Sequence, residues 1–318
     1  MMDVEASLQR VTRVESLASV LDRRLPEGAR PEIRIVELPV EGFRTTVKAG
    51  VVGGQAGFRG ARSTAVTPVE ECVIAHPLVE ELLVHGFYGE ATDVMIRVGA
   101  ATGERMAHVS PSATGVVLPE DVRIIGEDEL AAGRRSWIFE ELAGRRWRIS
   151  AHSFFQTRPD GALALVDVVR AEVRRVVGDG PVGRLVDACA GVGLFAGTIP
   201  SEHVTAIEWS RSACADARVN LADREAKIVG SAIDRWRPTP ADVVIADPSR
   251  PGLGRSGVEI ITRTNAPVVI LISCDSAAGA RDLQRFVEAG YRIDAMSMVD
   301  MFPHTARIEL VSTLVRGN

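Results

Sequence analysis

Lysine is almost absent from this sequence, and cysteine is scarce. Lys48 and Lys227 are the only lysines among 318 residues, and the 37 basic residues face 42 acidic ones. With a formal charge of −5 the chain is no polycation, so any contact with nucleic acid must come from a local basic patch. The four cysteines lie far apart and form no CxxC pair, which argues against a zinc site or a disulfide framework. The sequence therefore predicts no metal centre.

Long apolar runs and a secretion signal are also missing. The apolar run at residues 266–272 is far shorter than the roughly 20 residues that span a bilayer. Acidic residues stand near the N-terminus, where a signal peptide needs a basic region. We therefore expect a cytoplasmic protein with no membrane partner. Its composition, 46% hydrophobic and 25% charged, is typical of a globular chain, and its length suggests about two domains.

The spacing of apolar residues divides the chain into three parts. An N-terminal amphipathic helix is predicted because apolar residues recur at helical spacing at Val4, Leu8, Val11, Val14, Leu17, Leu21 and Leu25. Short β-rich segments with glycine turns follow up to about Ser150, the first at residues 33–40, and predict a small α+β domain. Beyond Ser150, apolar strands alternate with helices, which is typical of a doubly wound parallel sheet.

No helix separates the sixth strand of this sheet, residues 292–298, from the seventh, residues 308–314. A parallel neighbour needs a crossover of a dozen or more residues, whereas an antiparallel strand can return through a short turn. The seventh strand is therefore expected to run antiparallel. By this arrangement the second half of the chain resembles the class I S-adenosylmethionine-dependent methyltransferases.

Four of the predicted strands end in a residue suited to ligand chemistry, namely Asp187, Glu208, Asp247 and Cys274. Ligands of open α/β sheets bind outside the carboxyl ends of the strands. Gly191 and Gly193 let a ligand approach the backbone closely. A carboxylate at the end of the second strand can accept hydrogen bonds from ribose hydroxyls. These features predict a nucleoside-bearing cofactor. Residues 191–196 also fit the GxGxxA pattern of nicotinamide-binding proteins.

Several short motifs stand in a characteristic order along the chain. They are GFR at 57–59, EECVIAHP at 70–77, ISAHSFFQ at 149–156, DACAGVGLF at 187–195, DPSR at 247–250, SCD at 273–275 and DMFPHT at 300–305. By these motifs the chain resembles the RNA uracil-5-methyltransferases from about Phe43 onward. The resemblance implies a seven-stranded class I methyltransferase sheet, its last strand antiparallel, preceded by a smaller α+β domain. It implies three domains: an N-terminal helix (1–32), an RNA-facing central domain (33–145) and a catalytic domain (146–318).

The resemblance also implies roles for individual residues. Cys274 is the implied nucleophile that adds to uracil C6, and Glu309 is the implied base that removes the C5 proton after methyl transfer. The residues implied to bind S-adenosylmethionine are Gln156, Asp187, Cys189, Gly191, Gly193, Leu194, Glu208, Ser231 and Asp247. A helix should begin after Cys274, and a helix N-terminus lowers the pKa of a thiol.

The partner implied by the resemblance is RNA, either ribosomal or transfer RNA. Between Gly42 and Val69 no acidic residue interrupts a set of basic residues that could follow phosphates, namely Arg44, Lys48, Arg59 and Arg62. A target uridine must be flipped out of a helix or lie in a loop. An exposed arginine-bearing hairpin without RNA contact is the alternative interpretation of this stretch.

The sequence departs from the family pattern at several points. Many members have an N-terminal oligonucleotide-binding barrel and some an iron–sulfur cluster, and neither is expected here, since Cys72 alone matches a cluster ligand. Asp275 and Arg307 replace a usual asparagine and histidine, and a carboxylate beside Cys274 should raise the thiol pKa. A catalytically impaired RNA-binding homologue is therefore one alternative. A nicotinamide-dependent oxidoreductase is another, although it leaves Cys274 and Glu309 without a role.

Overall fold

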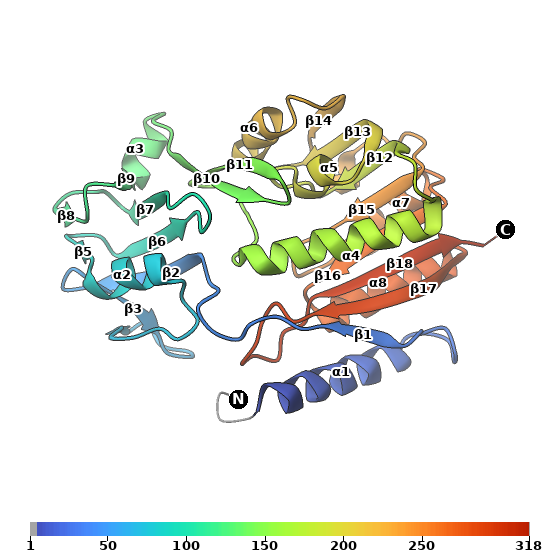
Figure 1. Ribbon diagram of the computed structural model, residues 1–318, viewed down its shortest axis with the longest axis horizontal. Coiled ribbons are helices and arrows are strands. Elements are labelled where there is room, and N and C mark those ends of the chain that lie inside the picture. The colour runs from blue at the N-terminus through green and yellow to red at the C-terminus, as the bar shows by residue number, and fades with distance from the viewer. Residues whose placement is uncertain (1–4, 318) are drawn as a thin grey trace. The chain divides into compact units, whose positions relative to one another are not determined.

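The computed structural model describes residues 5–317 and divides the chain into two compact units (Figure 1). The first unit comprises residues 1–38 and 163–318, and the second comprises residues 39–162. These boundaries differ from the predicted ones, because the N-terminal segment up to residue 38 joins the C-terminal part of the chain. Residues 1–4 of the predicted N-terminal helix domain and residue 318 lie outside the described residues.

An eight-stranded, mostly parallel sheet forms the centre of the first unit. Its spatial order is β1 (Ile33–Val36), β17 (Tyr291–Val299), β18 (Leu310–Arg316), β16 (Val268–Ser273), β15 (Val243–Ala246), β12 (Val182–Ala188), β13 (Ser201–Glu208) and β14 (Ala226–Gly230). Strand β18 runs antiparallel to both of its neighbours, and every other pair is parallel. The predicted fold class and its antiparallel last strand are confirmed.

Strand β1 was expected in the central domain, and this placement is wrong. It pairs in parallel with β17, with Ile33 opposite Met296, and so adds an eighth strand to the seven that the pattern predicts. Its four residues are too short a run to show from the sequence which sheet they join. The edge of the sheet is therefore built from residues near both ends of the chain.

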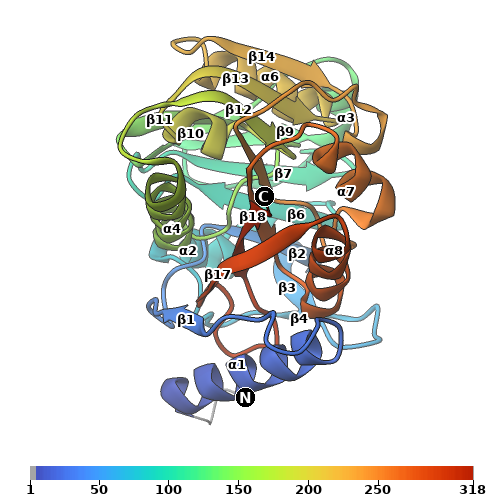
Figure 2. The ribbon, with the colours of Figure 1, turned by 90° about the vertical axis from the view of Figure 1, so that its right-hand side faces the viewer.

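Helices cover both faces of this sheet. They are α1 (Ala6–Asp22), α4 (Pro159–Val177), α5 (Leu194–Thr198), α6 (Arg211–Asn220), α7 (Gly254–Thr262) and α8 (Ser276–Glu288), with a 3-10 turn, η1, at Ile233–Arg235. Figures 1 and 2 show α4 on one face and α7 and α8 on the opposite face. Strands β15 and β16 are apolar and buried along their whole length, as expected for strands covered on both sides.

Helix α1 follows the predicted apolar pattern only in its second half. Leu17 and Leu21 are buried in the core that α7 and α8 share with the sheet. Leu8 and Val11, which the pattern places on the same buried face, are instead exposed. Burial of Leu8 and Val11 therefore does not hold the first half of α1 in place.

Polar side chains hold the first half of α1 against the loop that follows β17. Arg13 Nη2 lies 2.5 Å from Asp300 Oδ1, and Arg10 Nε lies 2.6 Å from Asp300 Oδ2. The backbone N–H of His304 donates to Gln9 Oε1 at 2.9 Å. Arg13 and Asp300 are buried, so solvent screens their attraction little. Helix α1 thereby fixes the loop that leads to Glu309.

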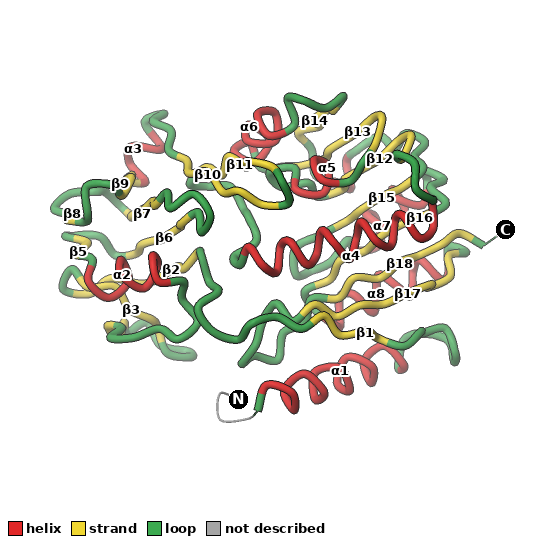
Figure 3. The backbone as a smooth tube through the Cα atoms, in the orientation of Figure 1, coloured by secondary structure: helices red, strands yellow, loops and turns green. Residues whose placement is uncertain are grey.

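The second unit consists mainly of strands, with two short helices (Figure 3). Its main sheet has the order β4 (Val66–Pro68), β3 (Gln55–Arg59), β2 (Thr46–Val52), β6 (Asp93–Val98), β7 (Arg105–Ser110) and β9 (Val122–Gly126). Two smaller sheets pair β5 (Phe87–Tyr88) with β8 (Val116–Val117) and β10 (Trp137–Leu142) with β11 (Arg145–Ser150). The helices are α2 (Pro77–His85) and α3 (Glu127–Ala131). This agrees with the predicted α+β domain.

Within the part of the chain that the structure describes, every helix is too short or too polar to cross a bilayer.

Candidate functional site

The carboxyl ends of four adjacent strands bring the strand-end residues of the first unit together. Asp187 lies in β12, Glu208 ends β13, Asp247 follows β15 and Cys274 follows β16. Because these strands are parallel neighbours, their carboxyl ends meet at one edge of the sheet. The charges of Asp247 and Glu208 both act on Asp187. The three carboxylates therefore form one acidic cluster.

The turn after β12 has a backbone that depends on glycine. Gly191 and Gly193 have φ values of 54° and 96°. A Cβ added to Gly193 would also lie only 3.0 Å from Leu221 Cδ1. Cys189 has a φ of 123°, a conformation that non-glycine residues seldom adopt. This strained turn leads directly into α5, whose first residue is the buried Leu194.

Glu208 is held by backbone donors on both of its oxygens. Gly191 N–H donates to Oε2 at 2.9 Å, and Ser210 N–H donates to Oε1 at 2.7 Å. Each carboxylate oxygen keeps a further lone pair, so the fixed group can still accept hydrogen bonds from hydroxyls. Ser231 lies beside it, because the Ser231 N–H donates to the Glu208 carbonyl at 3.0 Å.

Asp187 is fully buried and only partly satisfied. Its Oδ2 accepts a hydrogen bond from the Ala196 N–H at 2.9 Å, while its Oδ1 has no hydrogen-bond partner among the described residues. Burial, and then the charges of Asp247 and Glu208, raise the pKa of Asp187 to about 7. A buried oxygen without a donor is costly, so this cluster favours a ligand that brings a donor or a positive charge.

Cys274 directly follows β16, and Glu309 directly precedes β18, the strand that pairs antiparallel with β16. The register pairs Ser273 of β16 with Leu310 of β18, which makes Cys274 and Glu309 the next opposed positions. Burial, together with the charges of Glu309 and Asp247, raises the pKa of the Cys274 thiol to about 11. Burial and the neighbouring Asp247 also raise the pKa of Glu309 well above its usual value.

Both sequence-based expectations about this thiol need correction. The pKa of Cys274 is raised overall and not lowered, because burial, and then the charges of Glu309 and Asp247, disfavour the thiolate. Asp275 is not the carboxylate that raises the thiol pKa. Its side chain caps α8 by accepting a hydrogen bond from the Ala278 N–H at 2.8 Å, whereas Glu309 and Asp247 supply the unfavourable charge.

Two further residues bear on the predicted cofactor site. Gln156, a predicted cofactor-binding residue, belongs to the second unit, where it is buried, and its role stays a prediction. Trp209 was not predicted, yet it follows Glu208 directly and is 76% exposed. An aromatic residue immediately after a strand-end carboxylate was the available sequence signal.

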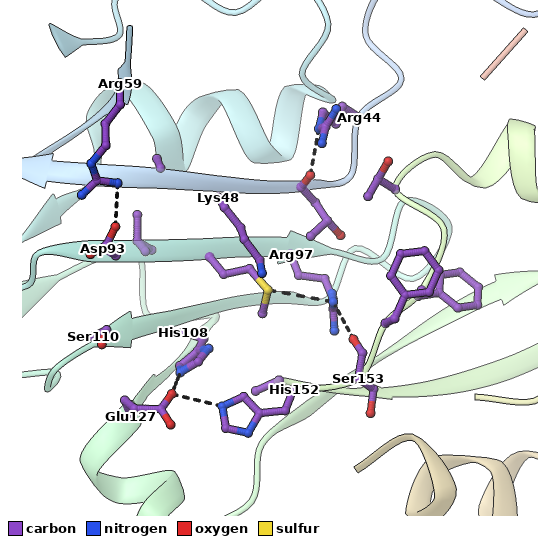
Figure 4. A pocket seen from close by; sticks show the side chains of 18 residues that line it. Arg44, Lys48, Arg59, Asp93, Arg97, His108, Ser110, Glu127, His152 and Ser153 are labelled. Atoms are coloured by element: carbon purple, nitrogen blue, oxygen red, sulfur yellow. Dashed lines mark hydrogen bonds and ion pairs between the residues drawn. The ribbon is translucent and has the colours of Figure 1, made fainter. Parts of the chain in front are cut away.

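The second unit contains a pocket of about 730 Å³ with a basic lining, shown in Figure 4. Three of the four predicted RNA-binding residues line it, namely Arg44, Lys48 and Arg59. Arg62 lies outside the pocket, in the exposed turn after β3. Two of the lining arginines are anchored: Arg59 pairs with Asp93 at 2.7 Å, and Arg44 Nε donates to the Thr46 carbonyl at 3.1 Å.

Comparison with known proteins gives the family. No protein-family model matches the chain. An uncharacterized RNA methyltransferase of Streptomyces avermitilis is 33% identical over 298 residues, which cover 86% of this chain and 67% of the relative. A second, from Streptomyces coelicolor, is 33% identical over 299 residues, covering 86% of this chain and 64% of the relative. The chain belongs to this family of RNA methyltransferases.

A solved structure supports the fold of this methyltransferase chain along its whole length. The crystal structure of Pyrococcus abyssi tRNA (uracil-54, C5)-methyltransferase in complex with S-adenosyl-L-homocysteine matches with a TM-score of 0.76 and 22% identity. The match covers 99% of this chain and 84% of the archaeal one. At this level of identity the likeness shows the shared fold of the two chains.

Proposed function

We propose that this chain transfers a methyl group from S-adenosylmethionine to C5 of a uridine in RNA. The observation that carries the proposal is the opposition of Cys274 and Glu309 at the sheet edge that also bears the acidic cluster. The methyltransferase family supports the reaction class. The reaction named for the Pyrococcus abyssi structure supports uracil C5 as the acceptor. Ribosomal and transfer RNA are both candidate substrates.

The acidic cluster fits the charge and shape of the cofactor. Asp187 and Asp247 would hold a positively charged group, whose charge would offset the burial and the carboxylate repulsion that raise the pKa of Asp187. Glu208 is fixed with lone pairs available to the ribose hydroxyls, and the glycine turn permits close approach of the ligand. The exposed ring of Trp209 offers a flat apolar surface to the adenine. Further contacts are proposed for Gln156, Cys189, Leu194 and Ser231. When bound, the sulfonium supplies an electrophilic methyl group.

Cys274 and Glu309 divide the remaining chemistry. The Cys274 thiolate adds to C6 of uracil, and the electron pair of the C5–C6 double bond moves toward C5, which becomes nucleophilic. After C5 is methylated, the Glu309 carboxylate removes the C5 proton. The electrons of that C–H bond rebuild the C5–C6 double bond and expel the thiolate. The raised pKa of Glu309 makes its carboxylate a stronger base for this step.

RNA binding is proposed for the basic pocket of the second unit. Arg44, Lys48 and Arg59 line this pocket, and Arg62 extends the basic surface along the hairpin that follows β3. Cationic side chains of this kind contact phosphates without reading sequence. The target uridine itself must leave its stack to reach a thiol.

The direct test is methylation of RNA by the purified protein. Labelled S-adenosylmethionine is incubated with unmodified transfer RNA or ribosomal RNA, and the nucleosides are analysed for 5-methyluridine. The protein should label one of the two RNAs, and Cys274→Ala should abolish the label. Cys72→Ala is the matched control, because this cysteine lies in the second unit. Full activity of Cys274→Ala would refute the mechanism.

The impaired RNA-binding homologue keeps one observation in its favour, the raised pKa of Cys274. That alternative predicts cofactor binding in calorimetry with no 5-methyluridine in either RNA. The oxidoreductase alternative predicts stabilisation by a nicotinamide cofactor, and not by S-adenosylmethionine, in a thermal shift.

A further inference from the structure

Three side chains converge in the wall of the second unit's pocket and take no part in the proposed methyl transfer. His108 lies on β7, Glu127 begins α3 and His152 follows β11. His108 Nε2 lies 2.7 Å from Glu127 Oε2, and His152 Nε2 lies 3.1 Å from the same oxygen. Figure 4 shows both rings directed at that carboxylate. The three ligand atoms all lie within 4.8 Å of one another.

This spacing is close to that of a metal-ligand set. Zn²⁺ binds histidine nitrogens and carboxylate oxygens at about 2.0–2.2 Å in a tetrahedral arrangement, so its ligand atoms lie roughly 3.3 Å apart. The two measured distances, 2.7 and 3.1 Å, are slightly shorter because the atoms meet as hydrogen-bonding partners. Small side-chain movements would open the space for an ion. Two imidazoles and one carboxylate also form the protein ligand set of zinc sites that keep a fourth position open.

The fold holds these three side chains in place. Strands β7 and β9 are paired, and α3 follows β9 without a loop. The rings of His108 and His152 pack edge to face with centroids 5.1 Å apart.

We infer that His108, Glu127 and His152 form a binding site for a divalent transition metal of the zinc class, with a fourth coordination position open to the pocket. Ca²⁺ and Mg²⁺ prefer oxygen ligands, so they fit this set poorly. Lys48 and Arg97 line the same pocket. Their positive charge favours an anionic group as the fourth ligand. The site shares no residue with the proposed methyl-transfer chemistry, and its test needs neither RNA nor cofactor.

The test is metal titration of the full-length, metal-stripped protein. Calorimetry with Zn²⁺ should show one saturable site, and Co²⁺ should give the visible absorption of a four-coordinate ion. His152→Ala and Glu127→Gln remove one ligand each from side chains that are about half exposed, so the variants should stay folded, which circular dichroism checks. Loss of an outer-shell partner already costs about 10–100-fold in metal affinity, so loss of a direct ligand should cost at least about 100-fold.

The matched control is His203→Ala in the first unit. His203 also pairs with a glutamate, Glu225, at 2.9 Å, but this pair belongs to no three-ligand group among the described residues. Its replacement should leave zinc affinity unchanged. Absence of saturable zinc binding by the wild-type protein would overturn the inference. Equal zinc affinity in the wild type, His152→Ala and Glu127→Gln would overturn it as well, since the metal would then be held elsewhere, for example by thiols.

Discussion

The ion pair between α1 and the loop after β17 should make a large contribution to stability. Asp300→Asn keeps the shape of the side chain but removes the charge that faces Arg10 and Arg13. Arg13 and Asp300 are only 4% and 1% exposed. Removing one partner of a buried ion pair leaves an uncompensated charge and costs about 3–5 kcal/mol. The free energy of unfolding should fall by this amount.

Urea unfolding followed by circular dichroism measures the loss. With a slope of about 3 kcal/mol per molar urea, a loss of about 3 kcal/mol lowers the midpoint by about 1 M. Asp22→Asn is the matched control, because it breaks the Arg30–Asp22 pair (2.6 Å) at the other end of the same helix, where Asp22 is exposed. Exposed ion pairs contribute little, so the midpoint of this control should hardly move.

The comparison of the two variants decides the argument. If Asp300→Asn lowers the midpoint no more than Asp22→Asn does, the buried pair does not hold α1 to the loop. A second check is Arg13→Met combined with Asp300→Leu, which replaces the two buried partners by apolar residues and leaves Arg10 paired with Glu37 at 2.8 Å. Such a replacement of a buried pair is often nearly neutral. This double variant should be more stable than Asp300→Asn.

Three further predictions concern the sheet edge of the first unit. Gly193→Ala should lower the free energy of unfolding by about 1–2 kcal/mol, because position 193 has a left-handed backbone. It should also weaken S-adenosylmethionine binding in calorimetry, since the new Cβ would lie 3.0 Å from Leu221. The control is Gly178→Ala, at φ 103° with open space around it, which should lose stability but keep cofactor affinity. The rate of alkylation of Cys274 should rise about tenfold per pH unit up to about pH 10, since the thiolate is the nucleophile and the pKa of the thiol is about 11. A rate that levels off near pH 9 would contradict this. Glu309→Gln should leave a protein–RNA adduct that survives denaturation, and the adduct should vanish when Cys274→Ala is added.

The central sheet could be predicted because its information is local. Each buried strand is a short apolar run, and helices lie between the parallel strands, so the seven predicted strands and their directions follow from the pattern alone. Ligands of open α/β sheets bind at the carboxyl ends of the strands. The positions of Asp187, Glu208, Asp247 and Cys274 at the ends of predicted strands therefore predict that they lie at one edge of the sheet. The structure agrees, because the parallel register carries these positions to the same side.

What the sequence could not show depends on partners far along the chain. The hydrophobic pattern of α1 predicts exposed polar residues, but Arg13 is buried because Asp300, 287 positions away, neutralises it. The pKa of Cys274 depends on Glu309, which only the antiparallel register brings opposite. The convergence of His108 with two other ligands likewise arises from three separate elements and leaves no sequence spacing to recognise.

The pairing of β1 with β17 has a consequence for the order in which the protein is made. The second unit, residues 39–162, is continuous and interrupts the first, so it can fold on the ribosome as soon as it emerges. Strand β1 is synthesised before it, yet its partner at residues 291–299 is synthesised only after the whole second unit. The nascent chain must therefore carry β1 unpaired until β17 is made, and the large sheet is completed only when these two segments, far apart in the chain, meet.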